Sequence, residues 1–73
     1  MSKEIVIITG GASGLGLELV KQFIEKNYLV CNIDRDFEKM KILNNTYQGN
    51  YEGFIGDISD SRFVKEVINK ISN

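Results

Sequence analysis

IVIITGGASGLGLELV, residues 5–20, predicts a buried strand, a glycine-rich turn and the start of a helix, in that order. The β-branched run at positions 5–8 is typical of a strand in a parallel sheet that is covered on both faces. The chain must then turn sharply, and apolar residues recur at helical spacing from Leu17 onward. Such a turn favours the binding of an anion, because free backbone N–H groups and the positive end of the helix dipole would point at it.

The spacing of the glycines narrows the type of site. Thr9-Gly10 and Gly14-Leu15-Gly16 form the pattern TGxxxGxG, which differs from the GxGxxG pattern of ordinary dinucleotide sites. No Lys-Ser or Lys-Thr follows the last glycine, so the segment is not a Walker phosphate loop. The alternative interpretation is a tight strand-to-helix turn that binds no ligand.

The TGxxxGxG segment resembles the N-terminal cofactor motif of the classical short-chain dehydrogenase/reductase family. The related extended family has GxxGxxG, and Ser13 breaks that pattern here. The resemblance covers essentially the whole chain but only the first part of the family's domain. It implies a diphosphate cradle formed by Gly10, Ser13, Gly14, Leu15 and Gly16.

Length and composition limit the other possibilities. Seventy-three residues allow one small domain, residues 1–73, and 42% hydrophobic residues are ordinary for a globular chain. A net charge of −1 without a basic cluster argues against a nucleic-acid partner, and no apolar run is long enough to cross a membrane. The single cysteine, Cys31, is expected to be a reduced core residue of a cytoplasmic protein. The chain has no His, which argues against a metal site.

The remaining pattern predicts alternating helices and strands. We expect a half-Rossmann α/β unit of three parallel strands in the order 3-2-1. Tyr47, Tyr51 and Phe54 are expected to pack in strands and loops rather than to stack on nucleic-acid bases, because basic partners are lacking. The expected helices cover residues 15–26, 37–43 and 60–71, and the expected strands after the first cover residues 28–33 and 52–56. Asn27 is expected as the left-handed residue that follows the first helix, and residues 44–46 are expected to break the second.

Asp34 follows the second expected strand at the distance from the glycines where dinucleotide folds place an acidic residue on the adenosine ribose. Its carboxylate can accept hydrogen bonds from both ribose hydroxyls and would repel a 2′-phosphate. This favours NAD over NADP as the cofactor. Arg35 is a possible complication, because it could reach a 2′-phosphate, although it could also be merely solvated. The alternative interpretation is that Asp34 is merely an exposed carboxylate at a strand end and contacts no ribose.

Asp57 and Ile58 stand at the end of the third expected strand. In the family that the chain resembles, an Asp at this point and the next backbone amide recognise the edge of the adenine. A carboxylate can accept from the exocyclic amine, and a backbone N–H can donate to a ring nitrogen. The alternative is that Asp57 helps to cap the last helix, for which Ser59 is the expected N-cap.

The family's catalytic set is an Asn, a Ser and a Tyr-x-x-x-Lys pair. The residues four positions after Tyr28, Tyr47 and Tyr51 are Asn32, Tyr51 and Ile55, so no Tyr here has the required Lys. We therefore assign no catalytic residue to the chain. The expected function is the dinucleotide-binding portion of an NAD(P)-dependent oxidoreductase; the rivals are a stand-alone nucleotide-binding module without a reaction and a structural self-association domain.

The expected partners are the cofactor and either a second copy of the chain or further C-terminal polypeptide. In the resembled fold another strand pairs with the outer edge of the first strand. Without that strand, residues 5–8 form an apolar edge that can recruit a second copy in an antiparallel manner. A lysine in place of Val6 is expected to break this assembly.

Overall fold

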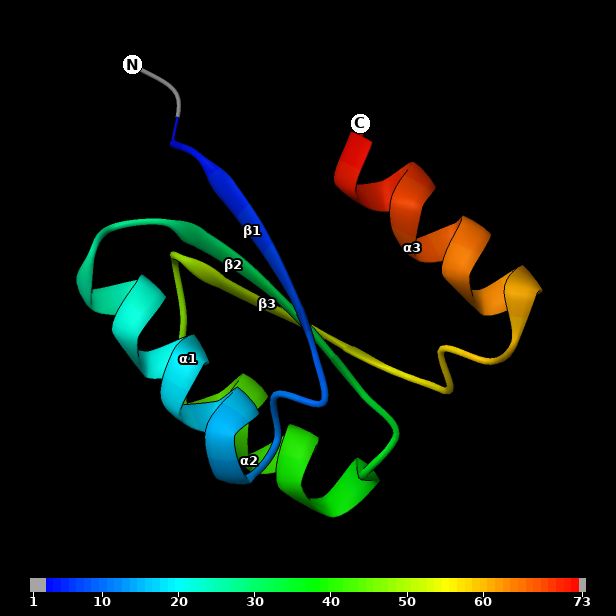
Figure 1. The fold of residues 1–73 in the computed structure, drawn as a ribbon, viewed down its shortest axis with the longest axis horizontal. Coiled ribbons are helices and arrows are strands. Elements are labelled where there is room, and N and C mark those ends of the chain that lie inside the picture. The colour runs from blue at the N-terminus through cyan, green and yellow to red at the C-terminus, as the bar shows by residue number, and fades with distance from the viewer. Residues whose placement is uncertain (1–2, 73) are drawn as a thin grey trace.

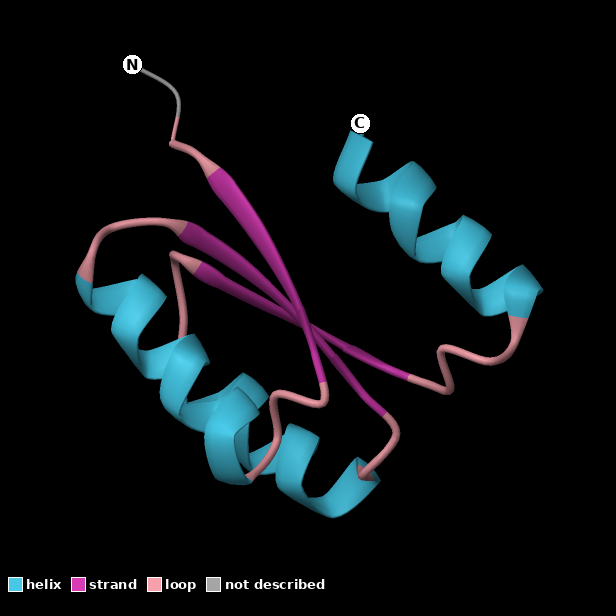
Figure 2. Ribbon diagram, in the orientation of Figure 1, coloured by secondary structure: helices cyan, strands magenta, loops and turns pink. Residues whose placement is uncertain are grey.

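A computed structural model describes residues 3–72 and shows a three-stranded sheet with three helices (Figures 1 and 2). All strands are parallel, and β2 lies between β1 and β3. The predicted strand order and fold class are therefore confirmed. The elements are β1 (Ile5–Thr9), α1 (Gly14–Glu25), β2 (Leu29–Asp34), α2 (Phe37–Thr46), β3 (Tyr51–Ile55) and α3 (Ser61–Ser72).

The helices divide between the two faces of the sheet. α1 and α2 lie together on one side, and α3 stands on the other (Figure 1). The register places Val30 of β2 between Val6 of β1 and Tyr51 of β3. Because the strands are parallel and in register, their C-terminal ends meet at one edge of the sheet.

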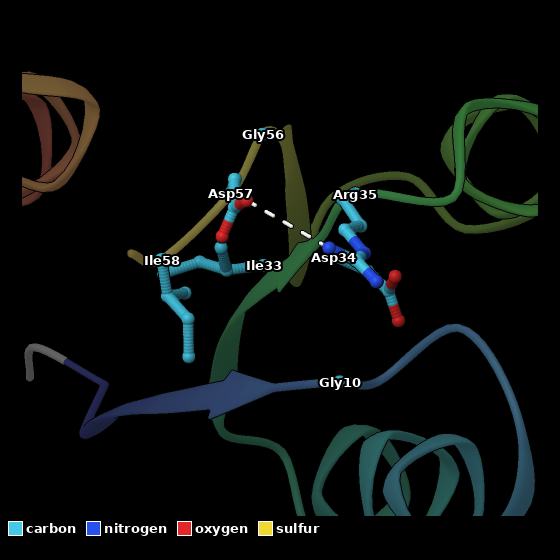
Figure 3. A pocket seen from close by; sticks show the side chains of 7 residues that line it. All are labelled: Gly10, Ile33, Asp34, Arg35, Gly56, Asp57 and Ile58. Carbon is cyan, nitrogen blue, oxygen red and sulfur yellow. Dashed lines mark ion pairs between the residues drawn. The ribbon is translucent and has the colours of Figure 1, made fainter. Parts of the chain in front are cut away.

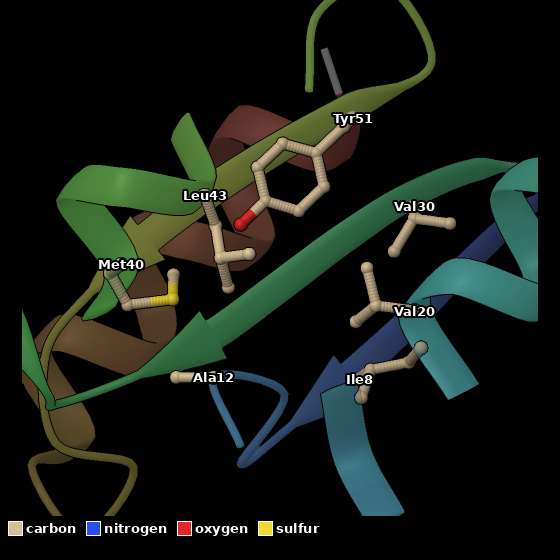
Figure 4. Close-up of a cluster of buried hydrophobic side chains, with 7 residues drawn as sticks. All are labelled: Ile8, Ala12, Val20, Val30, Met40, Leu43 and Tyr51. Atoms are coloured by element: carbon tan, nitrogen blue, oxygen red, sulfur yellow. The ribbon is translucent and has the colours of Figure 1, made fainter. Parts of the chain in front are cut away.

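Each face of the sheet has its own core. The larger one, under α1 and α2, consists of Ile8, Ala12, Val20, Val30, Met40, Leu43 and Tyr51 (Figure 4). The smaller one, under α3, contains Cys31, Ile33, Phe54 and Val67. The burial of Tyr51 and Phe54 confirms that these rings pack in the core and form no exposed stacking platform.

β1 departs from the expectation of a strand that is covered on both faces. Ile8 is buried, but the side chains of Ile5 and Ile7 remain 48% and 50% exposed. The reason is that these two residues point toward the face of the sheet on which, among residues 3–72, α3 is the only helix. The smaller core under α3 includes no residue of β1.

The predicted helix ends are partly right. Asn27 adopts a φ of 68°, which confirms it as the left-handed residue that follows α1. The prediction that residues 44–46 break the second helix is wrong, because α2 continues to Thr46. The Thr46 hydroxyl donates to the carbonyl oxygen of Ile42 at 2.8 Å, which satisfies a group at the helix end. Phe37, the first residue of α2, is 58% exposed.

Within residues 3–72, the helices are all too short or too polar to span a bilayer.

Candidate functional site

A pocket of about 260 Å³ lies where the C-terminal ends of the three strands meet (Figure 3). Each strand contributes the residues at or just beyond its last position. The lining residues are Gly10, Ile33, Asp34, Arg35, Gly56, Asp57 and Ile58. Ligands of open α/β sheets bind in a crevice at this edge, outside the carboxyl ends of the strands.

Asp34 connects the second strand to the glycine turn. Its Oδ2 accepts a hydrogen bond from the backbone N–H of Ala12 at 3.0 Å, and its Oδ1 accepts from that of Asp36 at 2.9 Å. An ionised carboxylate offers about four acceptor sites, so each oxygen keeps room for another donor. Asp34 can therefore hold the turn in place and still accept hydrogen bonds from a ligand.

The glycine turn is open where a ligand would lie and tight where the helix packs. Gly10 and Gly14 have φ values of 71° and 56°, which disfavour residues with a side chain. A Cβ built on either one would meet no atom within 4 Å. A Cβ on Gly16, by contrast, would overlap the carbonyl oxygen of Gly10. Gly16 thus lets the first turn of α1 approach the end of β1.

The N-terminus of α1 has no side-chain cap. Ser13 occupies the cap position in an extended conformation without a capping hydrogen bond, and the first turn has no acidic residue. At α2, in contrast, the Asp36 carboxylate accepts from the N–H of Lys39 at 3.1 Å, and Glu38 lies in the first turn. The positive end of α1 is therefore available to an anion from outside the chain.

Asp57 is held as a carboxylate by its neighbours. It accepts from the N–H and the hydroxyl of Ser59 at 2.9 and 2.8 Å, and Arg35 lies 3.7 Å away (Figure 3). The hydrogen bonds from Ser59, and then the charge of Arg35, lower the pKa of Asp57 below its usual value. Asp57 is therefore ionised at neutral pH and can act as an acceptor.

This arrangement corrects the predicted cap of the last helix. Ser59 donates to Asp57 and does not cap α3, and the Asp57 carboxylate bonds to Ser59 rather than to the helix. The cap is Asp60, whose Oδ1 accepts from the N–H groups of Arg62 and Phe63 at 3.0 and 3.4 Å. The tight turn at Asp57 uses Ser59 and moves the helix start one residue further along the chain.

The predicted site residues fall into three groups. Gly10, Asp34, Arg35, Asp57 and Ile58 come together around the pocket at the strand ends. Ser13 and Gly14 line a second pocket of about 340 Å³, together with Ala12, Leu17, Lys39, Ile42 and Leu43. Leu15, which is 78% exposed, and Gly16 line neither pocket.

Two contributors to the site escaped the sequence analysis. The N–H of Ala12 reaches Asp34, and no pattern of side chains reveals a backbone donor. Asn32 is fully buried beneath the turn, where a Cβ on Gly11 would overlap its amide group. Asn32 also donates to the Tyr51 hydroxyl at 3.3 Å. The sequence signal that could have revealed the position of Asn32 beneath the turn is that it is a polar residue in an otherwise apolar strand.

The buried titratable groups offer no acid or base at neutral pH. Burial, and then the charge of Glu52, raise the pKa of the Cys31 thiol. Burial also raises the pKa of Tyr51. Both groups therefore stay neutral within the core. In the part of the chain that the structure describes, no three His, Cys, Asp or Glu side chains are grouped to hold a metal ion.

The chain is similar in sequence to proteins of one family. The sequence profile of the short chain dehydrogenase family matches residues 4–73. The chain is 34% identical over 67 residues to a cis-2,3-dihydrobiphenyl-2,3-diol dehydrogenase of Paraburkholderia xenovorans, covering 92% of this chain and 24% of that protein. It is 30% identical over 76 residues to a 1,2-dihydroxy-1,2-dihydronaphthalene dehydrogenase of Pseudomonas putida, covering 99% of this chain and 29% of the relative.

A solved structure shows the same fold. A short-chain dehydrogenase from Streptomyces avermitilis superposes with a TM-score of 0.82 at 21% identity, over 96% of this chain and 26% of that one. The chain thus spans about a quarter of the length of the relatives that it matches. Because the family profile matches nearly every residue, the chain belongs to the short-chain dehydrogenase family.

Proposed function

We propose that this chain binds the adenosine and diphosphate half of a dinucleotide cofactor, NAD in preference to NADP. The observation that carries the proposal is the convergence of Gly10, Asp34 and Asp57 on one pocket at the strand ends. At this edge of the sheet, Gly10 would leave space for the diphosphate, Asp34 would accept hydrogen bonds from the ribose, and Asp57 would accept one from the adenine. The family relationship supports the same ligand class.

The residues present fit the proposed ligand. The open space over Gly10 and Gly14 is a cradle that any Cβ would begin to fill, and the uncapped start of α1 attracts the diphosphate. Asp34 retains acceptor sites for the ribose hydroxyls. The ionised Asp57 accepts from the exocyclic amine of the adenine, while the backbone N–H of Ile58 donates to a ring nitrogen.

The preference for NAD rests on the charge near the ribose. The Asp34 carboxylate would repel a 2′-phosphate, and Arg35 is drawn toward Asp57 at 3.7 Å. Arg35 is nevertheless 81% exposed in its side chain and can move. A charged hydrogen bond contributes roughly 1.5–3 kcal/mol, which corresponds to a preference of about tenfold or more.

By the same proposal, this chain is the cofactor-binding portion of an NAD(P)-dependent oxidoreductase. The bound nicotinamide would supply the hydride chemistry, whereas the matched residues of this chain contact only the adenosine and diphosphate. We assign no catalytic role to any of them. A module that binds nucleotide without a reaction is the second candidate, because the same pocket supports binding alone equally well.

Calorimetric titration with four ligands tests the proposal. NAD, ADP-ribose and ADP are expected to bind with similar affinity, on the order of millimolar, because they share the contacted half and the pocket is shallow. Nicotinamide mononucleotide, which lacks the adenosine, should show no binding. An affinity for NAD far above that for ADP-ribose would contradict the proposal, because it would require a site for the nicotinamide.

Replacement of Asp34 tests the choice of cofactor. Asp34→Ala is expected to bring the dissociation constants of NAD and NADP within about threefold of each other, because the repulsion is removed and Arg35 is free to assist. The same change removes acceptors for two backbone N–H groups, so the variant should also unfold at a lower temperature.

Asp34→Asn is the matched control, since its amide oxygen can keep one of these bonds without the charge. It should relax the discrimination as well, with a smaller loss of stability. If the unmodified chain already binds NADP more tightly than NAD, Arg35 dominates and the preference assigned here is wrong.

A further inference from the structure

Asn32 is a polar residue in the middle of the sheet. It lies in β2 between Cys31 and Ile33, and the register places it opposite Ile8 of β1 and Gly53 of β3. Its exposure is 0% among residues 3–72 alone, so its surroundings do not depend on any other polypeptide. A buried amide weakens a fold unless hydrogen bonds compensate for the lost water, and we therefore followed its contacts in each direction.

On one side, the Asn32 amide is held by β3 and α2. Its nitrogen donates to the Tyr51 hydroxyl at 3.3 Å and to the Met40 sulfur at 3.6 Å. Tyr51 and Met40 both belong to the larger core (Figure 4). A Cβ on Gly53 would lie 2.9 Å from the Tyr51 hydroxyl oxygen, so the missing side chain of Gly53 leaves room for this hydroxyl. This side of the amide is therefore fixed in place.

On its other side, the Asn32 amide lies against the glycine turn. A Cβ on Gly11 would overlap the Asn32 carbonyl oxygen and would lie 2.6 and 2.9 Å from the amide carbon and nitrogen. Gly11 does not share the positive φ of Gly10 and Gly14. Its backbone is therefore compatible with alanine, and it is the Asn32 amide that excludes a side chain at this position.

Stability alone does not account for an amide at this place. The carbonyl oxygen of Asn32 has no hydrogen-bond partner among residues 3–72. An apolar side chain of similar size would avoid the cost of removing this oxygen from water. A leucine is branched, however, and is thicker than a planar amide. It could not lie beneath Gly11 without moving the turn.

Asn32 and Asp34 contact successive residues of the turn. They are two positions apart in β2, so their side chains leave the same face of the strand. Asn32 lies against Gly11, and the Asp34 carboxylate accepts from the N–H of Ala12 at 3.0 Å. These two contacts together set the distance between the turn and β2.

We propose that Asn32 is a positioning residue for the glycine turn. Its amide, held by Tyr51, supports Gly11 and thereby fixes the backbone N–H groups that follow Gly11 in the turn. The inference rests on the proposed function, because it takes this turn to be the part of the chain that binds the diphosphate. Without the amide, the turn can move toward the sheet, and nucleotide binding weakens although the chain remains folded.

Amide hydrogen exchange without ligand, followed by titration with ADP, tests the inference in Asn32→Ala. Val30→Ala is the matched control, since it truncates another fully buried side chain two positions earlier on the same face of β2. Below the melting temperature of both variants, the Ala12 N–H should exchange about tenfold faster in Asn32→Ala than in Val30→Ala. The dissociation constant of ADP should rise about threefold or more in Asn32→Ala and stay unchanged in Val30→Ala.

A double variant tests the contact itself. Gly11→Ala should weaken ADP binding, because the new methyl group pushes the turn away from Asn32. Adding Asn32→Ala gives this methyl group space, so the double variant should bind ADP more tightly than Gly11→Ala alone. Losses of affinity that simply add would show that the two residues act independently, and would overturn the inference.

The exchange measurement decides the inference even if one variant or the ligand fails. An Ala12 exchange rate in Asn32→Ala equal to that in Val30→Ala overturns it. If Asn32→Ala does not fold, Tyr51→Phe takes its place, because it removes only the hydroxyl that holds the amide. Tyr51→Phe should speed exchange at Ala12 and leave the Leu29 N–H unchanged, and no effect at Ala12 overturns the inference. Absence of ADP binding by the unmodified chain would instead refute the proposed function, whereas exchange at Ala12 would still decide the role of Asn32.

Discussion

The Gly14→Val variant is expected to fold and to lose measurable nucleotide binding. Gly14 adopts a φ of 56°, and the space around its missing side chain is open. A valine there would project into the space that the diphosphate needs. The affinity should fall by at least tenfold, about 1.4 kcal/mol, which takes a millimolar ligand out of the measurable range.

The left-handed backbone at this position also costs stability, so a matched control is needed. A side chain in this conformation costs about 1–2 kcal/mol, against about 4–11 kcal/mol of total stability for a domain of this size. Gly49, in the loop before β3, also has a positive φ, 85°, and open space for a Cβ. Gly49→Val should therefore lower the melting temperature similarly and retain ADP binding. Equal binding by the two variants would show that the diphosphate does not lie over Gly14.

The Gly16→Ala variant is expected to be strongly destabilised, although alanine is the better helix former. Helix propensity alone predicts a gain of about 0.5–1 kcal/mol for this change. The new methyl group would, however, overlap the carbonyl oxygen of Gly10, which is backbone and cannot rotate away. Overpacking of this kind costs about 1–3 kcal/mol and occasionally more.

Chemical denaturation followed by circular dichroism gives the sign of this effect. The midpoint for Gly16→Ala should be lower than that of the unmodified chain, and nucleotide binding should weaken because the turn shifts. A higher midpoint would mean that α1 moves away from the end of β1 without cost. In that case Gly16 would serve the ligand rather than the packing of the helix.

Local patterns were sufficient to predict the fold. The structure confirms three local predictions. The β-branched residues at 5–8 form β1, the helical periodicity after Gly16 belongs to α1, and Asn27 is the left-handed residue that follows this helix. The convergence of the strand ends follows from parallel connections alone. It places Gly10, Asp34 and Asp57 around one pocket.

The parts that the sequence could not predict depend on contacts between distant or backbone groups. The Asp34–Ala12 hydrogen bond joins a side chain to a backbone donor across the fold. The choice of Asp60 over Ser59 as a cap depended on a competing bond to Asp57, which propensity does not contain. The exposed face of β1 could not follow from composition, since its β-branched run is equally typical of a strand covered on both faces.

The most direct test of the central claim is a ¹H–¹⁵N spectrum of the chain titrated with ADP-ribose. We expect the largest amide shifts at residues 10–16, 34–35 and 57–58, which are remote in sequence and of which Gly10, Asp34, Arg35, Asp57 and Ile58 line the pocket at the strand ends. Adding NAD in place of ADP-ribose should shift the same amides to similar extents. Shifts confined to other surfaces, or no shifts at saturating millimolar ligand, would contradict the account.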